Sequence, residues 1–268
     1  MKVSVSNISW GDIKKNFEYF KYLKKIGVNG IELAPSLCFK NINNVSAEQI
    51  NILKRQFKKN NLKFIGFHSL FFGKNNVHFF QSKRKLNNLK NQLTALIKLC
   101  KNLGGKNLVL GSPKNRSVKK KNYNNCKILF KKFLLEMDPI LNANKINLLI
   151  EPLARPESDF LTSMNEGARL VKSINKQNIQ LHLDTKTLIL SKENLNYFFK
   201  KYFYLIKHIH VSDVGLLVPG SINNEHVAIG SYLKKIKYKG FITLEIKKTT
   251  NPKKSIKKGI SYIRNNYV

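Results

Sequence analysis

The chain has 268 residues, of which 42% are hydrophobic, and this is enough to bury a sizeable core. It contains no apolar run of about 18 residues or more, so we expect no membrane-spanning helix. The first residues are too few and too polar for a signal peptide, which favours a cytoplasmic protein.

The net charge of +34 raises the question of a nucleic-acid partner. Nearly all of this charge comes from Lys, and the lysines are spread along the chain instead of forming one block. Readout of guanine or phosphate by paired hydrogen bonds favours Arg. We therefore expect no specific nucleic-acid partner, although nonspecific binding to polyanions that weakens with salt is expected.

The cysteines Cys38, Cys100 and Cys126 are odd in number and irregularly spaced. This pattern fits neither a disulfide framework nor a zinc knuckle. Cys100 and Cys126 fall on the apolar faces of predicted helices, so we expect them to pack in the core.

An apolar segment followed by an amphipathic helix recurs eight times along the chain. Strands are predicted at Val3–Ile8, Asn29–Ala34, Lys63–Phe67, Asn107–Leu110, Leu148–Glu151, Ile179–Asp184, Ile206–Val211 and Phe241–Ile246. Helices are predicted near Asp12–Ile26, after Ser46, over Leu86–Leu103, over Ile128–Leu141, after Ser163, from about Ser191, near Ser231–Ile236 and from Pro252.

Local signals mark several of the predicted helix ends. The segments Ser46–Gln49 and Ser163–Glu166 both have the spacing of a capping box, in which the first and fourth residues bond to each other's backbone. Gly104 stands where one helix should end, and Pro252 stands at the first position of the last helix.

Regular alternation of strands and helices, without a linker or a break in composition, predicts an α/β fold. The apolar strands suit a parallel sheet that helices cover. We therefore predict a single (β/α)8 TIM barrel that spans residues 1–268 as one domain. In such a barrel the active site lies at the C-terminal ends of the strands.

Polar residues stand at those ends in the last four predicted strands, namely Glu151, Asp184, His210 and Glu245. They are separated by about one strand–helix repeat each, so they should converge on one place. Carboxylates and an imidazole together suit a divalent cation such as Mn²⁺ or Mg²⁺, with Co²⁺ or Zn²⁺ as alternatives. Without a cation, three carboxylates would repel one another and raise one another's pKa.

The motifs around these residues resemble the xylose-isomerase-like TIM barrel superfamily, which includes sugar phosphate isomerases and epimerases and the AP endonuclease family 2 protein endonuclease IV. The resemblance covers the whole chain and is sharpest after residue 146. It is carried by Glu151-Pro152-Leu153-Ala154-Arg155, Leu183-Asp184-Thr185, His208-Ile209-His210-Val211-Ser212-Asp213, His226-Val227-Ala228-Ile229-Gly230 and Thr243-Leu244-Glu245.

The nearest pattern is that of the ketose 3-epimerases. The resemblance implies that Glu151, Asp184, His210 and Glu245 bind the metal, and that Glu151 and Glu245 are also the acid/base pair. The implied reaction is isomerisation or epimerisation of a sugar or sugar phosphate through an enediolate. A dehydratase acting beside a carbonyl is a close variant, and a homo-oligomer is compatible with the family.

Substrate contacts are expected from five residues, namely His68, Arg116, Arg155, Glu157 and His226. The chain departs from the ketose epimerases at Thr187, where they have a substrate-contacting His, and at Leu216, where they have an Arg. A free ketohexose is therefore doubtful as the substrate. Basic residues near the strand ends could instead hold an anionic group, and the candidates are Lys114, Arg116, Lys186 and Lys247.

Two other functions stay open. Endonuclease IV has a three-metal site, and the chain keeps part of that pattern but has Gly111, Thr187 and Asn224 where ligands would be needed. A degenerate barrel that binds a sugar without turning it over is the second alternative. Among the remaining polar residues, His182 and His208 lie deeper on their strands and are expected to be structural, whereas Glu32 could orient a neighbour or touch a ligand.

Overall fold

Eight parallel strands close into a barrel in the computed structural model, which describes residues 1–11 and 17–268. Each strand pairs with its neighbours in chain order, and β8 pairs with β1. The predicted TIM barrel is confirmed. The strands are β1 (Lys2–Ser6), β2 (Gly30–Leu33), β3 (Lys63–Phe67), β4 (Asn107–Leu110), β5 (Asn147–Ile150), β6 (Ile179–Asp184), β7 (Ile206–Val211) and β8 (Phe241–Leu244).

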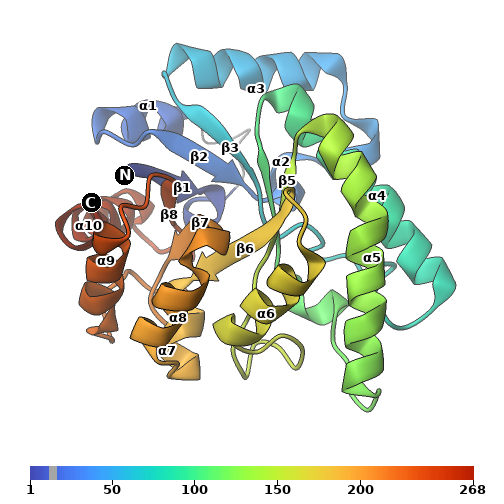
Figure 1. Ribbon diagram of the computed structural model, residues 1–268. Coiled ribbons are helices and arrows are strands. Elements are labelled where there is room, and N and C mark those ends of the chain that lie inside the picture. The colour runs from blue at the N-terminus through green and yellow to red at the C-terminus, as the bar shows by residue number, and fades with distance from the viewer. Residues whose placement is uncertain (12–16) are drawn as a thin grey trace.

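Helices surround the strands, as Figure 1 shows. The strands are buried on both faces, which is why their sequences read as continuous apolar runs. The α-helices in the described residues are α1 (Glu18–Lys25), α2 (Pro35–Cys38), α3 (Ala47–Lys59), α4 (Lys83–Leu103), α5 (Tyr123–Asn144), α6 (Met164–Ile174), α7 (Thr185–Ser191), α8 (Leu195–Tyr202), α9 (Glu225–Lys235) and α10 (Pro252–Tyr267).

Most predicted helix ends are confirmed. Ser46 and Gln49 form a complete capping box at the start of α3, and Gly104 ends α4 in the left-handed region at φ 82°. At α6 only half of the expected box forms. Ser163 accepts a hydrogen bond from the Glu166 N–H, but the Glu166 carboxylate accepts from the N–H of Thr162 and from the Tyr123 hydroxyl.

Three helices differ from the prediction. The helix expected after β6 is divided into α7, which begins directly at Thr185, and α8. Helix α9 begins at Glu225, ahead of the start predicted near Ser231, so His226 lies on the helix. The first helix begins at Glu18 in the described chain, and residues 12–16 of the helix predicted near Asp12–Ile26 lie outside the described residues.

The inside of the barrel is partly polar. Ser4 and Thr243 lie 2.6 Å apart through their hydroxyls, and the Thr243 hydroxyl is 3.0 Å from His208 Nε2. All three side chains are fully buried. Because buried polar groups need partners, this chain of hydrogen bonds supports the histidines from below.

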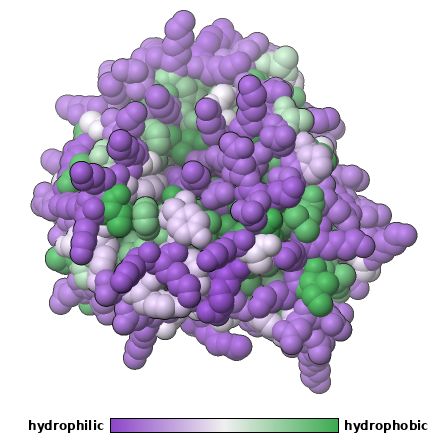
Figure 2. Space-filling model, in the orientation of Figure 1, coloured by the Kyte–Doolittle hydropathy of each residue, from purple (hydrophilic) through white to green (hydrophobic). Residues whose placement is uncertain are grey.

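The surface is dominated by polar side chains. Figure 2 shows that hydrophobic residues on this face are confined to small separate areas among hydrophilic ones. Within the described residues, none of the helices combines the length and apolarity needed to span a bilayer. All three cysteines are buried thiols, and this confirms the core position expected of Cys100 and Cys126.

Candidate metal centre and active site

Four side chains from successive strands meet at the C-terminal end of the barrel. Glu151 and Glu245 directly follow β5 and β8, Asp184 ends β6, and His210 lies in β7. One carboxylate oxygen each of Glu151, Asp184 and Glu245 lies within 4.8 Å of the other two. The convergence expected from the sequence is therefore present.

The two ring nitrogens of His210 have different surroundings. Its Nε2 lies 2.7 Å from Glu32 Oε2, and Glu32 also accepts from His208 at 3.0 Å. A carboxylate can only accept, so His210 donates from Nε2. Its Nδ1 faces the carboxylates, 3.2 Å from Glu245 Oε2 and 4.0 Å from Glu151 Oε1, and has no hydrogen-bond partner of good geometry among the described residues.

This donor set fits a divalent cation. Three buried carboxylates and an imidazole Nδ1 supply oxygen and nitrogen ligands of the kind that Mn²⁺, Mg²⁺, Co²⁺ or Zn²⁺ accept. A ligating His commonly donates its other N–H to a carboxylate, which fixes the ring orientation and the tautomer. Glu32 makes that contact with His210.

The environment drives the pKa values of the two glutamates apart. Burial, together with Asp184 and Glu245, raises the pKa of Glu151 to about 8, although Lys186 opposes this. Burial also acts against the charged form of Glu245, but His210 and His68 outweigh it and hold the pKa of Glu245 well below its usual range. Two carboxyl groups with opposite shifts are suited to acid and base roles.

Lys186 places an ammonium group at the centre. Its Nζ contacts the Asp184 carboxylate and lies 3.3 Å from Glu157 Oε2, and the side chain is almost fully buried. Burial opposes the charge, but Asp184 and Glu151 raise the pKa of Lys186 above its ordinary value. The ammonium therefore offsets part of the negative charge of the carboxylates.

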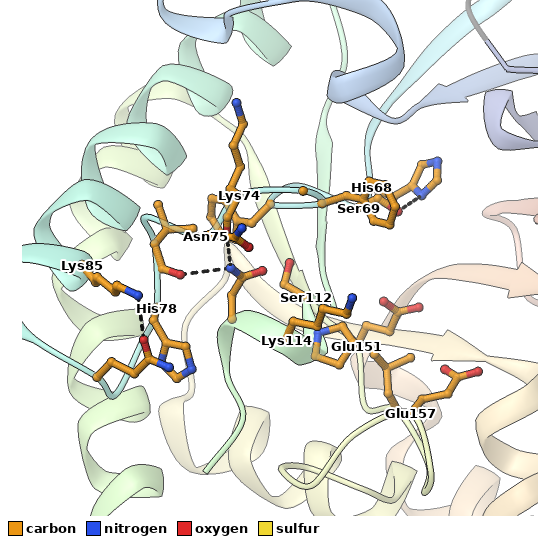
Figure 3. A pocket seen from close by; sticks show the side chains of 18 of the residues that line it. His68, Ser69, Lys74, Asn75, His78, Lys85, Ser112, Lys114, Glu151 and Glu157 are labelled. Carbon is orange, nitrogen blue, oxygen red and sulfur yellow. Dashed lines mark hydrogen bonds between the residues drawn. The ribbon is translucent and has the colours of Figure 1, made fainter. Parts of the chain in front are cut away.

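A cavity of about 680 Å³ opens above the carboxylates (Figure 3). His68, Glu151, Glu157, Lys186 and Glu245 all line it. His68 is held by the Ser6 hydroxyl at 2.8 Å from Nε2, and its Nδ1 lies 3.2 Å from Glu245 Oε1. Of the expected substrate contacts, His68 and Glu157 are therefore on the cavity wall.

The other three expected contacts lie elsewhere. Arg116 is fully buried, bonds the Leu110 carbonyl through Nη1 at 3.4 Å, and is not part of the cavity wall. His226 is buried against the Tyr267 hydroxyl at 2.6 Å, and Arg155 is exposed to solvent. A direct substrate contact by any of the three stays a prediction.

The backbone is strained at several points of the cavity wall. Ser69, Ser112 and Leu216 line the cavity and have φ angles of 50°, 48° and 57°. A residue other than Gly in this region costs about 1 kcal/mol or more, and such residues cluster at functional sites.

The sequence matches a known protein family over most of its length. Residues 20–266 match the model of the family described as xylose isomerase-like TIM barrel. The chain belongs to that family. The membership confirms the resemblance seen in the motifs at the strand ends.

Relatives and solved structures carry epimerase names. D-psicose 3-epimerase of Agrobacterium fabrum is 31% identical over 100 residues, which cover 37% of this chain and 35% of that protein. The match thus spans about a third of that relative's length. 3-Dehydro-D-guloside 4-epimerase of Escherichia coli is 20% identical over 92% of this chain and 93% of its own. A crystal structure of D-psicose 3-epimerase in the presence of D-fructose superposes with a TM-score of 0.85 at 18% identity, over 100% of this chain and 99% of that one, and this shows the shared fold.

Two contacts at the site were not predicted from the sequence. Lys186 follows Asp184 by two residues, and only the start of α7 at Thr185 turns its ammonium back onto that carboxylate. Gly111 touches Glu151, since a Cβ there would lie 2.0 Å from Glu151 Oε2. Glu32 orients His210, the first of the two roles expected for it, and its place in the middle of a buried strand is the signal in the sequence.

Proposed function

We propose that this protein is a metal-dependent isomerase or epimerase of a sugar or sugar derivative. The observation that carries the proposal is the convergence of Glu151, Asp184, Glu245 and His210 Nδ1 at the floor of one cavity. Membership of the family and the epimerase names of the relatives support it.

Glu151, Asp184, His210 and Glu245 would hold the cation, for which Mn²⁺ or Mg²⁺ are the first candidates and Co²⁺ or Zn²⁺ the alternatives. When bound, the cation would polarise the substrate carbonyl and stabilise the negative charge of an enediolate. His210 would be kept in the ligating tautomer by Glu32.

Glu245 and Glu151 would move the proton. Glu245, held ionised by His210 and His68, accepts the proton from the carbon next to the carbonyl. Glu151 would return a proton to the same carbon from the other face in an epimerisation, or to the former carbonyl carbon in an isomerisation. The reverse reaction exchanges the two roles.

His68 and Glu157 would bind substrate hydroxyls from the cavity wall. Ser6 orients His68 through Nε2, and Nδ1, which lies 3.2 Å from Glu245 Oε1, is the atom that would contact the substrate. We retain Arg116, Arg155 and His226 as secondary candidates, which would act by supporting the loops behind the cavity.

The endonuclease alternative lacks support at the positions of its extra ligands. A side chain at Gly111 would collide with Glu151, and the Thr187 hydroxyl is engaged with the Pro152 carbonyl at 3.1 Å. Asn224 is exposed ahead of α9. A trinuclear zinc site is not favoured by these residues.

Solvent exchange of carbon-bound hydrogen tests the proposal. We expect the Mn²⁺-loaded protein to incorporate deuterium next to the carbonyl of at least one keto sugar or sugar phosphate in D₂O. Glu245→Gln and Glu151→Gln should each lower exchange by about 100-fold or more. Glu136→Gln, an exposed change on α5, is the matched control.

The metal content of both variants should be measured with the exchange rate, because Gln keeps an oxygen that can ligate. Full exchange in metal-loaded Glu151→Gln and Glu245→Gln would refute the acid/base assignment. Sugar binding without exchange by any substrate would favour the non-catalytic alternative.

A further inference from the structure

We propose that the part of the same cavity beyond the metal centre, from its middle to its outer end, is a subsite for an anionic group of the substrate, a phosphate or a carboxylate, lined by Lys74, Lys85 and Lys114. This inference rests on the proposed function for the inner end and names the class of substrate. All three lysines line the cavity. They come from two loops, those after β3 and β4, and from the first turn of α4.

The cavity has two ends of opposite charge. Its carboxylates, Glu151, Glu157 and Glu245, belong to the inner end. Figure 3 shows Glu151 and Glu157 on one side, Lys85 and His78 on the other, and Ser112 and Lys114 between them. A ligand that spans the cavity would therefore meet the metal centre at one end and lysines at the other.

The outer lysines are not neutralised by the protein. In the described part of the chain, the lysines with a carboxylate oxygen within 4.0 Å are Lys90, Lys176 and Lys186. Lys85 is instead directed by a neutral group, since its Nζ donates to Gln81 Oε1 at 2.8 Å. An unpaired, partly screened cation on a cavity wall attracts an anion.

The loops that carry these lysines are fixed to each other. Asn115 donates from its side chain to the carbonyls of Lys74 at 2.8 Å and Val77 at 3.0 Å, and its own carbonyl accepts from Phe79 at 2.9 Å. Asn115 itself is buried. The backbones that carry Lys74 and Lys114 are therefore held together and need little reordering when a ligand binds.

His78 adds a neutral polar group to the outer end. His78 lines the cavity, and its Nδ1 accepts from the Phe80 N–H at 3.0 Å. Burial and the charges of Lys85, Lys119 and Lys121 lower the pKa of His78 to about 4, so it is a neutral donor.

The nearby carboxylate of Asp159 is held by other groups. It accepts hydrogen bonds from the Ser117 hydroxyl and from the N–H groups of Val118 and Lys119. These partners belong to the loop after β4, and no carboxylate oxygen of the described residues lies within 4.0 Å of Lys74, Lys85 or Lys114.

The cavity also has the room and the polar groups for a longer ligand. Its volume of about 680 Å³ falls in the range of pockets that bury ligands larger than one small ring, about 300–1,000 Å³. Ser112, between the two ends, has a buried hydroxyl without a partner in the described residues. The side chain of Leu216 lines the wall and is apolar. The preference for one substrate over another would therefore come from the outer lysines.

Binding of three probes to the Mg²⁺-loaded protein tests the subsite. The probes are D-fructose, D-fructose 6-phosphate and 5-keto-D-gluconate, measured by calorimetry at constant ionic strength. We expect an anionic probe to bind at least about tenfold more tightly than D-fructose. A gain for the phosphate alone would identify a phosphate subsite, and a gain for both would indicate a general anion subsite.

The triple variant Lys74→Gln, Lys85→Gln, Lys114→Gln should lose this preference without weaker D-fructose binding. The matched control is Lys83→Gln, Lys101→Gln, Lys120→Gln, which removes the same charge from exposed positions off the cavity. Equal binding of all probes to the wild type, or an equal loss in both triple variants, would overturn the subsite. Exchange of D-fructose hydrogen without an anion preference would overturn the subsite and leave the isomerase proposal standing. Lysine-dependent binding of anions without any hydrogen exchange would support the subsite and overturn the isomerase proposal.

Discussion

His210 donates a hydrogen bond from Nε2 to Glu32 and turns Nδ1 toward the centre of the site. We predict that Glu32→Gln lowers the affinity for Mn²⁺ by about 10- to 100-fold, because the amide holds the ring less firmly and no longer makes Nδ1 a stronger donor. A metal titration of the folded variant measures this. Glu48→Gln on the exposed face of α3 is the control, and an unchanged affinity would show that Glu32 does not orient the ligand.

Lys186 contacts the same carboxylate that a cation would use. We therefore predict that Lys186→Met raises metal affinity, by about tenfold, since a buried ammonium no longer repels the cation or occupies Asp184. Lys172→Met, at an exposed position of α6, should leave affinity unchanged. Weaker binding in Lys186→Met would mean that the lysine supports the site instead of competing with the metal.

Protonation at the centre makes metal binding dependent on pH. Burial raises the pKa of Glu151 from 4.5 to about 8, and Glu245 and Glu32 hold the pKa of His210 well above its ordinary value despite burial. Metal displaces these protons, so affinity should rise as the pH increases toward about 8. Calorimetry in two buffers of different ionisation enthalpy should detect proton release near pH 6.5, and binding without proton release would contradict this.

The raised pKa of Glu151 also makes the stability of the metal-free protein depend on pH. Because the folded pKa of Glu151 is raised, its favourable contribution to the metal-free protein is complete below about pH 4.5 and is lost as the pH rises through about 8. Metal loading removes the need for that proton. The increase in thermal stability on metal loading should therefore be larger at pH 8 than at pH 6.

At the scale of elements, Gly111 after β4 leaves the space that the carboxylate of Glu151 after β5 occupies. A Cβ at Gly111 would lie 2.0 Å from Glu151 Oε2, so Gly111→Ala should push the Glu151 carboxylate away from the centre. We predict a loss of metal affinity of about tenfold or more. The effect should disappear in a Glu151→Gln background, where that ligand is already weakened. Additive losses would show that Gly111 acts elsewhere.

The repeating elements could be predicted because periodicity and capping are local. The predicted boundaries of β3, β4, β6 and β7 agree with the structure to the residue, and the ends of α3 and α4 follow their capping signals. Helix α7 could not be predicted, because Asp184 is both the last residue of β6 and the N-cap of α7, where it accepts from the Lys186 N–H at 3.0 Å. One residue with two roles leaves no loop to mark the boundary.

The site was predictable only where strand order determines it. Successive parallel strands bring Glu151, Asp184, His210 and Glu245 together, and the repeat spacing is sufficient to expect this. The contacts of Arg116 and His226 depend instead on how loops and helices turn their side chains, and the sequence pattern does not record this. In the sequence, the lysines that line the cavity likewise look the same as the many lysines on the surface.

At the scale of the whole molecule, charge is spread around the barrel. With a net charge of +34, the protein should bind heparin or DNA at low salt and release it steeply as salt rises. Asp184→Ala should not weaken this binding, because the centre is not part of that surface. Salt-resistant, sequence-selective binding of nucleic acid would contradict our assignment of the charge to general solvation.

The central claim is that the barrel brings four side chains together around one divalent cation. Metal content after Mn²⁺ loading and dialysis tests it most directly, for wild type, Asp184→Ala, His210→Ala and the control Glu157→Gln, each checked for a folded barrel by circular dichroism. We predict about one metal per chain in the wild type and the control, and a loss in the other two. No metal in the wild type, or undiminished metal in Asp184→Ala and His210→Ala, would contradict the account, and about three zinc ions would favour the endonuclease alternative.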